Sequence, residues 1–481
     1  MQHHMVSNGP VQTAAKFPLV LDVDQALLCT DLFFESLWAA LGQNTGATLK
    51  TLVSKWRTPA RLSHDLSAIA TPDVDRLPVR EFLLDLAHAA LEEGRSVHLV
   101  SGSDQALVDT LGLRLGLPGP HFGSRPNNDL TGAAKAAFLE TRFGAGGYDY
   151  VGNVTQDGKP WEQAREVIAV APSAKLRRRL EAMEKPVEIV AENWNLATLV
   201  RELRPHQWVK NLLLLVPLLA AHQFGMTAVA QVVLAILAFS LGASSIYILN
   251  DLLDLNADRN HPEKCRRPIA AGTLPIPVAM MASAVLILLA LTLAMEVAPS
   301  VAAMTLLYMA GSLSYSLWLK KRRWLDVIAL SSLFLLRMLT GAIAADVPVP
   351  PILLALGFTV FFVLACVKRI TALSRMRLHG HLPGRGYSSS DLLKLEWATY
   401  GSIFLAATVF LLYTFGIETA GLYENRVLLA FAVVPLILWL YRNVQLSMEG
   451  REDYDPVRFV LRDRTGLAIA ASGIALIVLA I

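Results

Sequence analysis

Four oxygen-bearing side chains stand close together in the segment SSIYILNDLLDLNADRNHPEKCRRPIAAGTLP, just after an apolar stretch. They are Asn250, Asp251, Asp254 and Asp258. At 100° per residue these four fall within about 100° of one helix face. Carboxylates this close together repel one another unless cations neutralise them. Mg²⁺ prefers hard oxygen ligands, and it typically bridges protein carboxylates and substrate phosphates. Because Lys264, Arg266 and Arg267 follow as phosphate-binding cations, the segment predicts a metal-diphosphate site rather than a helix end with solvated acids.

A second pair of carboxylates stands near the N-terminus, in LVLDVDQALLCTD. Asp22 and Asp24 end a hydrophobic run that reads as a strand, and they are two residues apart, so both can point into one cleft. This spacing suits a nucleophile paired with an acid/base. The sequence therefore offers two separate reactive centres.

The composition places part of this chain in lipid. Of 481 residues, 54% are hydrophobic and 17% are charged, and the mean hydropathy is +0.44. The net charge of +3 is too small to indicate nucleic acid. Three cysteines without CxxC spacing suit a reducing compartment, and the N-terminus lacks a secretory signal, so we expect it to stay in the cytoplasm.

Nine apolar stretches follow residue 205, each near the ~20 residues needed to cross a bilayer. They are 208–224, 227–249, 276–295, 299–318, 325–345, 350–367, 397–417, 427–446 and 465–481. Lys and Arg concentrate in the loops after the second, fourth, sixth and eighth stretches, whereas the opposite loops hold only Arg426. The positive-inside rule therefore predicts an integral protein of the cytoplasmic membrane, with its N-terminal half and acidic segment in the cytoplasm and Ile481 outside.

Residues 1–195 read as a soluble α/β domain with its linker, and residues 196–481 as the membrane domain. Short β-branched runs such as SVHLVSG and YDYVGN alternate with helical stretches. Repeated strand-then-helix order predicts a Rossmann-like parallel sheet with ligands at the carboxyl ends of its strands.

The acidic segment resembles the first aspartate motif of the UbiA superfamily of intramembrane transferases, in the form NDxxDxxxDRxHPxKxxRPIAAG. The resemblance runs from about residue 200 to the end. It implies a helical membrane enzyme that uses Mg²⁺ to hold a diphosphate leaving group, usually of a polyprenyl donor, while a second substrate attacks. A multi-span helical bundle of nine transmembrane helices agrees with this family.

One departure from the family pattern bears on the substrate. Prenyl-diphosphate members have a second acidic motif, DxxxD, near the end of the sixth span, where this sequence reads FVLACVKRITALSRMR. Lys368 and Arg369 thus stand where carboxylates are expected, which suits direct binding of extra phosphate. Together with RPHQWVKN and YSLWLKKRRWLDVIALSSLFLLR, this segment resembles the branch that transfers 5-phosphoribosyl from phosphoribosyl diphosphate to a polyprenyl phosphate.

That resemblance implies roles for individual residues. Asn250, Asp254 and Asp258 hold Mg²⁺ on the donor diphosphate, and Asp251 supports them. The lipid phosphate attacks C1 of the ribose without a strong general base, because it is already ionised. The candidate phosphate-binding residues are Lys210, Lys264, Arg267, Lys320, Lys368 and Arg369.

Three further residues are candidates for substrate contacts. Arg337 lies well inside the fifth stretch, where a charge costs at least ~2.5 kcal/mol, so we expect it to face the bundle interior. Pairing with Asp326 within the same helix is not expected, because the two are eleven residues apart. Tyr315 is either a substrate contact or an interfacial anchor.

The N-terminal domain resembles the haloacid dehalogenase superfamily, mostly Mg²⁺-dependent phosphatases, over about residues 17–170. The resemblance implies that Asp22 is the nucleophile and Asp24 the acid/base. Ser101 and Lys135 become phosphate-binding residues, and Asp22, Asn153 and Asp157 become metal-side groups. The usual DxDGT is DVDQA here, and Asn153 replaces an acid, so metal affinity should be lower. The domain is either an active phosphatase or a support for the membrane part.

Two other functions compete with phosphoribosyl transfer for the membrane domain. The first is a polyprenyltransferase that moves a prenyl group from a polyprenyl diphosphate to an aromatic or other acceptor, and the missing carboxylates at the end of the sixth stretch count against it. A transporter is expected to carry charges near the bilayer midplane, whereas the acids here cluster at one edge.

Overall fold

The chain forms two compact units in the computed structural model, which describes residues 16–153, 158–171, 174–183, 185–190, 194–375, 385–419, 421–450 and 463–481. The first unit comprises Met1–Glu202 together with Asp251–Met280. The second comprises Leu203–Asn250 and Met281–Ile481. The acidic segment after Asn250 therefore packs with the N-terminal part of the chain, although it lies between two apolar helices in sequence.

A parallel sheet forms the centre of the first unit, and its six strands have the order β3-β2-β1-β4-β5-β6. The strands are β1 Leu19–Asp22, β2 Val97–Asp104, β3 Phe122–Ser124, β4 Asp149–Gly152, β5 Val167–Val170 and β6 Val187–Val190. The order reverses direction between β1 and β4, which places the carboxyl end of β1 at the switch point where α/β sheets bind ligands. This confirms the predicted parallel α/β domain and is consistent with a haloacid dehalogenase-like fold.

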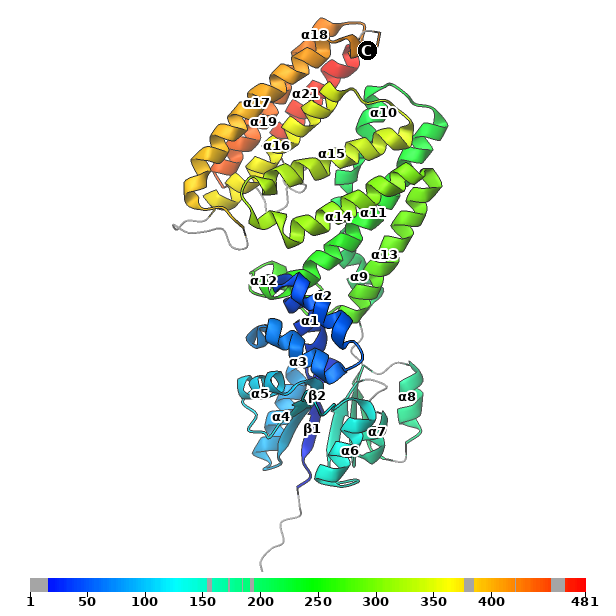
Figure 1. Cartoon of the computed structure of the whole chain (residues 1–481), viewed down its shortest axis with the longest axis vertical. Coiled ribbons are helices and arrows are strands. Elements are labelled where there is room, and N and C mark those ends of the chain that lie inside the picture. The colour runs from blue at the N-terminus through cyan, green and yellow to red at the C-terminus, as the bar shows by residue number, and fades with distance from the viewer. Residues whose placement is uncertain are drawn as a thin grey trace, which may run out of the picture. The chain divides into compact units, whose positions relative to one another are not determined.

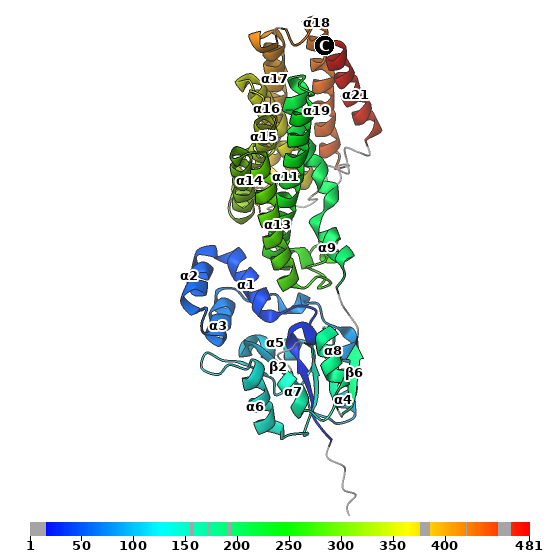
Figure 2. The same ribbon diagram turned by 90° about the vertical axis from the view of Figure 1, so that its right-hand side faces the viewer.

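Helices cover both faces of this sheet (Figures 1 and 2). Leu19 and Leu21 of β1 pack in one buried cluster with residues of α4 and α5, whereas Val20 packs in another with residues of α6 and α7. This alternation follows from the period of two in a strand. The helices of this unit, with α9 at its end, are α1 Leu32–Gln43, α2 Thr45–Lys55, α3 Pro59–Ile69, α4 Glu81–Glu92, α5 Gln105–Arg114, α6 Gly132–Phe143, α7 Gly158–Gln163, α8 Ala174–Glu181, α9 Leu196–Leu203 and α12 Leu255–Arg259.

The second unit is helical. Its helices are α10 Val216–Ala220, α11 Met226–Leu253, α13 Ile276–Val297, α14 Pro299–Leu317, α15 Leu325–Ala345, α16 Pro351–Ser374, α17 Leu392–Phe415, α18 Arg426–Phe431, α19 Val433–Met448 and α21 Arg464–Leu479, and α11 and α13 continue into the first unit. Helix α16 lies against α15, α17 and α19 (Figure 1). Alanines of α11, among them Ala235, Ala238 and Ala243, are buried in the largest apolar cluster of this unit, where small side chains allow helices to approach closely.

Seven helices in the described part of the chain are long and apolar enough to span a membrane, and α21 is a shorter apolar helix. The chain is therefore an integral membrane protein. The first predicted stretch, 208–224, does not form one long helix: Pro205–Leu215 is a 3₁₀ segment, and α10, with Pro217 in its first turn, adds only five residues. Gly341 of α15 lets this segment approach, because a Cβ there would lie 2.0 Å from the Leu214 carbonyl oxygen. The count of nine spans stays a prediction.

Candidate functional site

The acidic segment is not one continuous helix. Helix α11 ends at Leu253, α12 begins at Leu255, and Asp254 between them has φ −101° and ψ 14°. The Asp258 amide donates to the Asp254 carbonyl oxygen at 2.8 Å, which closes the turn. The face predicted for an unbroken helix is therefore bent at Asp254. The rotation of 100° per residue in a regular helix therefore does not give the position of Asp258 relative to Asp251. That position depends on the turn at Asp254.

Arg267 brings two of the predicted acids together. Its Nη1 lies 3.0 Å from Asp251 Oδ1 and also donates to Asp258 Oδ2. Lys264 Nζ lies 3.6 Å from Asp258 Oδ1. Both acids are buried. Burial raises the pKa of the Asp258 carboxyl, and the neighbouring Arg267 guanidinium acts against that rise. Arg267, predicted to bind phosphate, thus contacts the acids directly.

The chemical types of the side chains in this segment suit a divalent cation. Asn250 Oδ1 is buried and has no hydrogen-bond partner among the described residues. Carboxylate and amide oxygens are the ligands that Mg²⁺ prefers. No group of three or more His, Cys, Asp and Glu close enough to hold a metal occurs in the described residues. The segment therefore supplies oxygen atoms and negative charge of the kind that binds Mg²⁺, while the Arg267 guanidinium contacts two of its acids, Asp251 and Asp258.

A buried ion pair anchors the helix that carries Asp258. Arg259 Nη1 and Nη2 donate to the two Glu35 carboxylate oxygens at 2.9 and 2.6 Å, and Arg259 Nε donates to the Ala270 carbonyl oxygen at 3.0 Å. Thr30 donates to Glu35 Oε1 at 2.6 Å. Glu35 lies in α1 and was not predicted. Within the first unit, α12 is therefore fixed by a residue more than two hundred positions earlier.

A second charged cluster lies within the second unit. Asp326, in the first turn of α15, is fully buried and accepts from Arg369 of α16, from Arg385 Nη1 at 2.9 Å and from the Tyr315 hydroxyl at 2.8 Å. Arg385 also donates to the Tyr315 hydroxyl at 2.6 Å. Tyr315, Asp326 and Arg369 were each predicted as site residues, and the structure brings them together. Arg385 was missed because it lies outside any recognisable motif.

The other predicted cations occupy different settings. Lys368 directly precedes the buried Arg369 in sequence, but the Lys368 side chain is exposed. Lys210, in the 3₁₀ segment Pro205–Leu215, donates to Gln207 Oε1. Lys320 is half-buried in the short turn Leu319–Lys321 after α14. These three lie in the second unit, whereas Lys264 and Arg267 lie in the first.

Arg337 faces the interior of its helix bundle, as predicted. It is buried, and its Nε donates to Asn211 Oδ1 at 3.0 Å while Nη2 donates to the Tyr308 hydroxyl at 2.9 Å. Nη1 donates to the Leu333 carbonyl oxygen at 2.8 Å. The guanidinium also lies 4.7 Å from the Tyr308 ring centroid. Arg337 of α15 therefore contacts the 3₁₀ segment Pro205–Leu215 and α14 through the neutral side chains of Asn211 and Tyr308.

The N-terminal residues predicted from the haloacid dehalogenase resemblance converge at the carboxyl end of β1. Lys135 Nζ lies 2.8 Å from Asp22 Oδ1, and the Ser101 hydroxyl donates to Asp24 Oδ2. The Asn153 amide donates to the Gln25 carbonyl oxygen at 2.7 Å. Asp157 lies outside the described residues. A buried, ion-paired carboxylate beside a second one suits phosphate chemistry.

Asp31 is a further acid at this end of the sheet that sequence reasoning missed. Its carboxylate accepts from the Phe33 and Phe34 amides at 3.0 and 3.2 Å and so caps α1. Asp24 Oδ1 accepts from the Leu32 amide at 2.7 Å at the same helix start. Burial and the nearby Asp24 charge raise the pKa of Asp31 to about 7. The last Asp of LVLDVDQALLCTD directly precedes α1, and Asp is one of the residues preferred at a helix N-cap, so the sequence contained a signal for this role.

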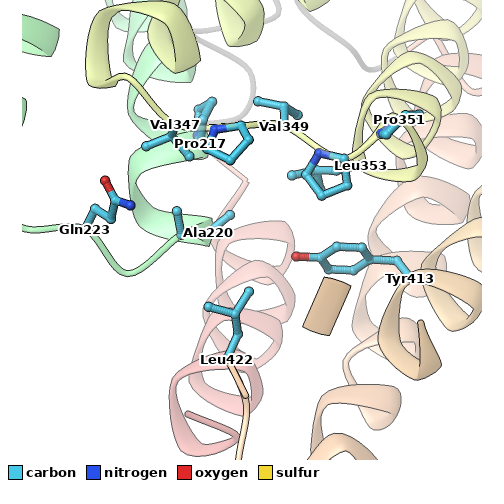
Figure 3. Close-up of a pocket in the computed structure, with 12 residues that line it drawn as sticks. Pro217, Ala220, Gln223, Val347, Val349, Pro351, Leu353, Tyr413 and Leu422 are labelled. Atoms are coloured by element: carbon cyan, nitrogen blue, oxygen red, sulfur yellow. The ribbon is translucent and has the colours of Figure 1, made fainter. Parts of the chain in front are cut away.

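An apolar cavity of about 570 Å³ lies elsewhere in the second unit (Figure 3). Pro217 and Ala220 line it from α10, Pro351 and Leu353 from the start of α16, and Tyr413 from the end of α17. Gln223 and Tyr413 are the polar side chains in its lining. None of the described residues that line it carries a charge, so these residues do not supply the cations that phosphate chemistry requires.

Comparison with known proteins adds sequence relationships. The model of the UbiA prenyltransferase family matches residues 211–462. An uncharacterised protein of Sinorhizobium fredii is 30% identical over 95% of this chain and 89% of its own length. A protein of Mycobacterium tuberculosis named decaprenyl-phosphate phosphoribosyltransferase is 31% identical over 58% of this chain and 92% of its own length.

Two further similarities cover the membrane part. Nodulation protein NoeC of Azorhizobium caulinodans is 34% identical over 57% of this chain and 89% of its own length. A solved UbiA homologue from Archaeoglobus fulgidus, bound to GPP and Mg²⁺, is 19% identical and covers 58% of this chain and 97% of that structure, with a TM-score of 0.43.

Proposed function

The chain belongs to the UbiA prenyltransferase family, and from that membership we propose that it transfers a 5-phosphoribosyl group from phosphoribosyl diphosphate to a polyprenyl phosphate. The mycobacterial relative, which this chain matches over 92% of the relative's length, is named decaprenyl-phosphate phosphoribosyltransferase. The reaction requires Mg²⁺ in this proposal. Asn250, Asp254 and Asp258 are the residues that would hold the ion, and Asp251 would support them.

The end of α16 is the observation that carries the choice of substrate. Lys368 and Arg369 stand there in place of a second acidic motif, and Arg385 joins Arg369 on one buried carboxylate. Two guanidinium groups on one carboxylate leave an excess of positive charge, and the exposed Lys368 adds to it. Such a cluster suits a donor with an additional phosphate, because cations bind phosphate oxygens directly.

The mechanism is mainly positioning and electrostatics. When bound, Mg²⁺ neutralises the charge that develops on the departing diphosphate. Lys264 and Arg267 bind phosphate oxygens of the donor, and Arg267 leaves Asp251 and Asp258 when it does so. A lipid phosphate oxygen attacks C1 of the ribose, a C–O bond forms there, and the bond from C1 to the diphosphate oxygen breaks. No general base is needed, because the attacking phosphate is ionised near neutral pH.

The same proposal includes the topology and the location. The positions of Lys and Arg support nine spans in the cytoplasmic membrane, with the N-terminal domain and the acidic segment in the cytoplasm and Ile481 outside. In this arrangement the first span is the broken segment of residues 205–220 followed by the turn before α11.

A two-donor assay tests the transfer reaction. Purified chain in detergent receives Mg²⁺ with either phosphoribosyl diphosphate and polyprenyl phosphate, or polyprenyl diphosphate and an aromatic acceptor. We expect diphosphate release only from the first mixture, and none after chelation. Turnover only in the second mixture would instead identify the chain as a conventional polyprenyltransferase. That alternative is also consistent with membership of the family.

We propose a second activity for the N-terminal domain, hydrolysis of the 5-phosphate of the transferred group. The pairing of the buried Asp22 with Lys135, and of Asp24 with Ser101, supports it. Asp22 attacks the phosphorus, the ribose O5 leaves with a proton from Asp24, and water then releases inorganic phosphate. The released lipid is polyprenyl phosphoribose.

Product analysis with Asp22→Asn tests this second activity. The parent chain should release inorganic phosphate, and the variant should accumulate the phosphorylated lipid at an unchanged rate of transfer. If both chains stop at the same phosphorylated lipid, the domain is not its phosphatase, and DVDQA and Asn153 mark lost catalysis.

A further inference from the structure

Helix α2 carries an apolar stripe that none of the described residues of its unit covers. Leu49, Val53 and Trp56 have side chains 52%, 79% and 65% exposed, and they are spaced i, i+4 and i+7. At 100° per residue these three positions span an arc of about 60°. A neighbouring side of the helix faces the protein, because Thr48 is buried and Leu52 packs against the cluster formed by α1 and α3. The stripe is thus a continuous outward face.

Positive charge borders this stripe, and negative charge is absent from the surrounding sequence. Between Glu35 and Asp65 the chain has no acidic residue, while Lys50, Lys55, Arg57 and Arg61 fall in this interval. Residues 1–200 as a whole carry 19 Lys and Arg against 23 Asp and Glu, so the basic interval departs from an acidic domain. Lys50 and Arg57 are exposed, and the Arg57 guanidinium lies 4.7 Å from the Trp56 ring centroid.

We propose that α2 lies in the surface of an anionic bilayer, with Leu49, Val53 and Trp56 in the headgroup boundary and Lys50 and Arg57 on lipid phosphates. A short helix with a basic polar face and Trp and Leu on the other face is typical of interfacial binding. Each basic side chain near an anionic surface contributes roughly a five-fold preference for it. The bilayer is the occupant that this charge favours, and the helices of the second unit already anchor the chain in one.

The contact has a consequence for the N-terminal domain. Helices α1 to α3 follow directly after Asp22 and Asp24 in sequence, and Asp31 caps α1. A bilayer-bound α2 therefore connects the segment that follows Asp22 and Asp24 to the bilayer in which a lipid-linked phosphate lies. The inference does not depend on which group the membrane domain transfers.

Depth measurement with a probe on α2 tests the proposal. The full chain with Cys29→Ser and Cys265→Ser receives Val53→Cys and a nitroxide, and it is reconstituted singly in nanodiscs of phosphatidylglycerol and phosphatidylcholine. The natural Cys366 is buried in α16. Leu113→Cys on α5 is the matched control, because Leu113 is an apolar helical residue of similar exposure, 81%. Accessibility to dissolved oxygen and to a water-soluble nickel complex is then compared.

We expect the probe at position 53 to be reached by oxygen and protected from nickel in the anionic discs, and less protected in phosphatidylcholine alone. The probe at position 113 should be accessible to nickel in both. Lys50→Glu with Arg57→Glu should reduce the protection at position 53 without altering position 113. Equal nickel accessibility at the two positions in anionic discs would overturn the proposal. So would protection at position 53 that requires two chains per disc, since the face would then bind a second copy.

Hydrogen exchange of the unlabelled chain tests the same contact without the cysteine substitutions and the nitroxide label. Amides of α2 should exchange more slowly in anionic than in zwitterionic discs, while amides of α5 should not change. An unchanged α2 would contradict bilayer docking independently of any substitution.

Discussion

Asp326 and Arg369 form an ion pair within the second unit, where the Asp326 side chain is fully buried and the Arg369 side chain is 3% exposed. Arg369 Nη2 lies 3.1 Å from Asp326 Oδ1, and Arg385 contacts the same oxygen at 2.9 Å. One carboxylate therefore holds two guanidinium groups near the end of α16. Its removal leaves both cations without their shared partner.

The first prediction concerns this carboxylate. Asp326→Asn should lower the stability of the chain in detergent by about 3 kcal/mol or more, because breaking a buried ion pair leaves an uncompensated charge. Asp346→Asn, at an exposed αL position after α15, is the matched control and should leave the melting temperature unchanged. Thermal unfolding measures both, and equal melting temperatures would show that Asp326 does not organise the cluster.

The second prediction separates Lys368 from Arg369. Since Arg369 is held by Asp326 and Lys368 is exposed, Lys368 is the cation available to the donor. Lys368→Ala should raise KM for phosphoribosyl diphosphate by roughly ten-fold, the loss of one charged hydrogen bond, and change KM for the lipid much less. Lys321→Ala, an exposed lysine, serves as control. A KM effect confined to the lipid would assign Lys368 to the other substrate.

The third prediction concerns the acidic segment. Asp254→Asn and Asp258→Asn should each abolish transfer while leaving expression and membrane insertion intact, because both supply charge for the metal. Binding of Mn²⁺, followed by its paramagnetic resonance, should weaken in the same variants and not in Asp85→Asn, an exposed acid of α4. Full activity in either variant, or activity that persists in chelator, contradicts the metal assignment.

The fourth prediction uses the buried pair of Glu35 and Arg259. Glu35→Gln should destabilise the first unit by about 3 kcal/mol, since Arg259 then lacks its buried counter-charge. Pulse proteolysis in detergent measures this, with Glu81→Gln at the exposed start of α4 as control. Arg259→Gln combined with Glu35→Gln should cost less than the sum of the two single changes. Additive costs would mean that the two side chains do not act as a pair.

The fifth prediction concerns pH. The pKa of Asp31, raised to about 7 by burial and by Asp24, exceeds the pKa of an unfolded Asp, so the folded chain binds an extra proton between about pH 4 and 7. Stability of the first unit should therefore decrease as the pH rises through this window. Asp31→Asn keeps an oxygen for the cap and should remove that slope in Mg²⁺-free buffer. A slope identical to that of the parent chain would exclude Asp31 as its source.

The sequence predicted the parallel sheet, because strand periodicity and the alternation with helices are local signals. It also predicted which residues of the N-terminal domain converge, since Asp22 ends β1, Ser101 lies in the second half of β2 and Asn153 follows β4, and the carboxyl ends of these parallel strands share one edge. The positions of the long apolar helices followed from composition. The break of the first stretch was missed, although Pro217 within an apolar run was visible.

Most of the ion-pair and hydrogen-bond partners of the charged side chains could not be predicted from the sequence. Arg267 was predicted to bind phosphate, and its contacts with Asp251 and Asp258 depend on the turn at Asp254, which helical periodicity does not foresee. Glu35 and Arg259 are too far apart in sequence for any spacing rule to pair them. Such long-range pairs are set by tertiary packing, and a single sequence carries no signal for them.

The mass of the lipid product is the measurement that tests the central proposal most directly. The chain receives Mg²⁺, polyprenyl phosphate and phosphoribosyl diphosphate labelled with ¹³C in the ribose, together with an equal amount of polyprenyl diphosphate. We expect a polyprenyl phosphate that has gained the labelled ribose, with or without its 5-phosphate, while the polyprenyl diphosphate is unchanged. This outcome holds whether or not the N-terminal domain is a phosphatase. Consumption of polyprenyl diphosphate without labelled ribose in the lipid would contradict the account and identify a prenyl donor.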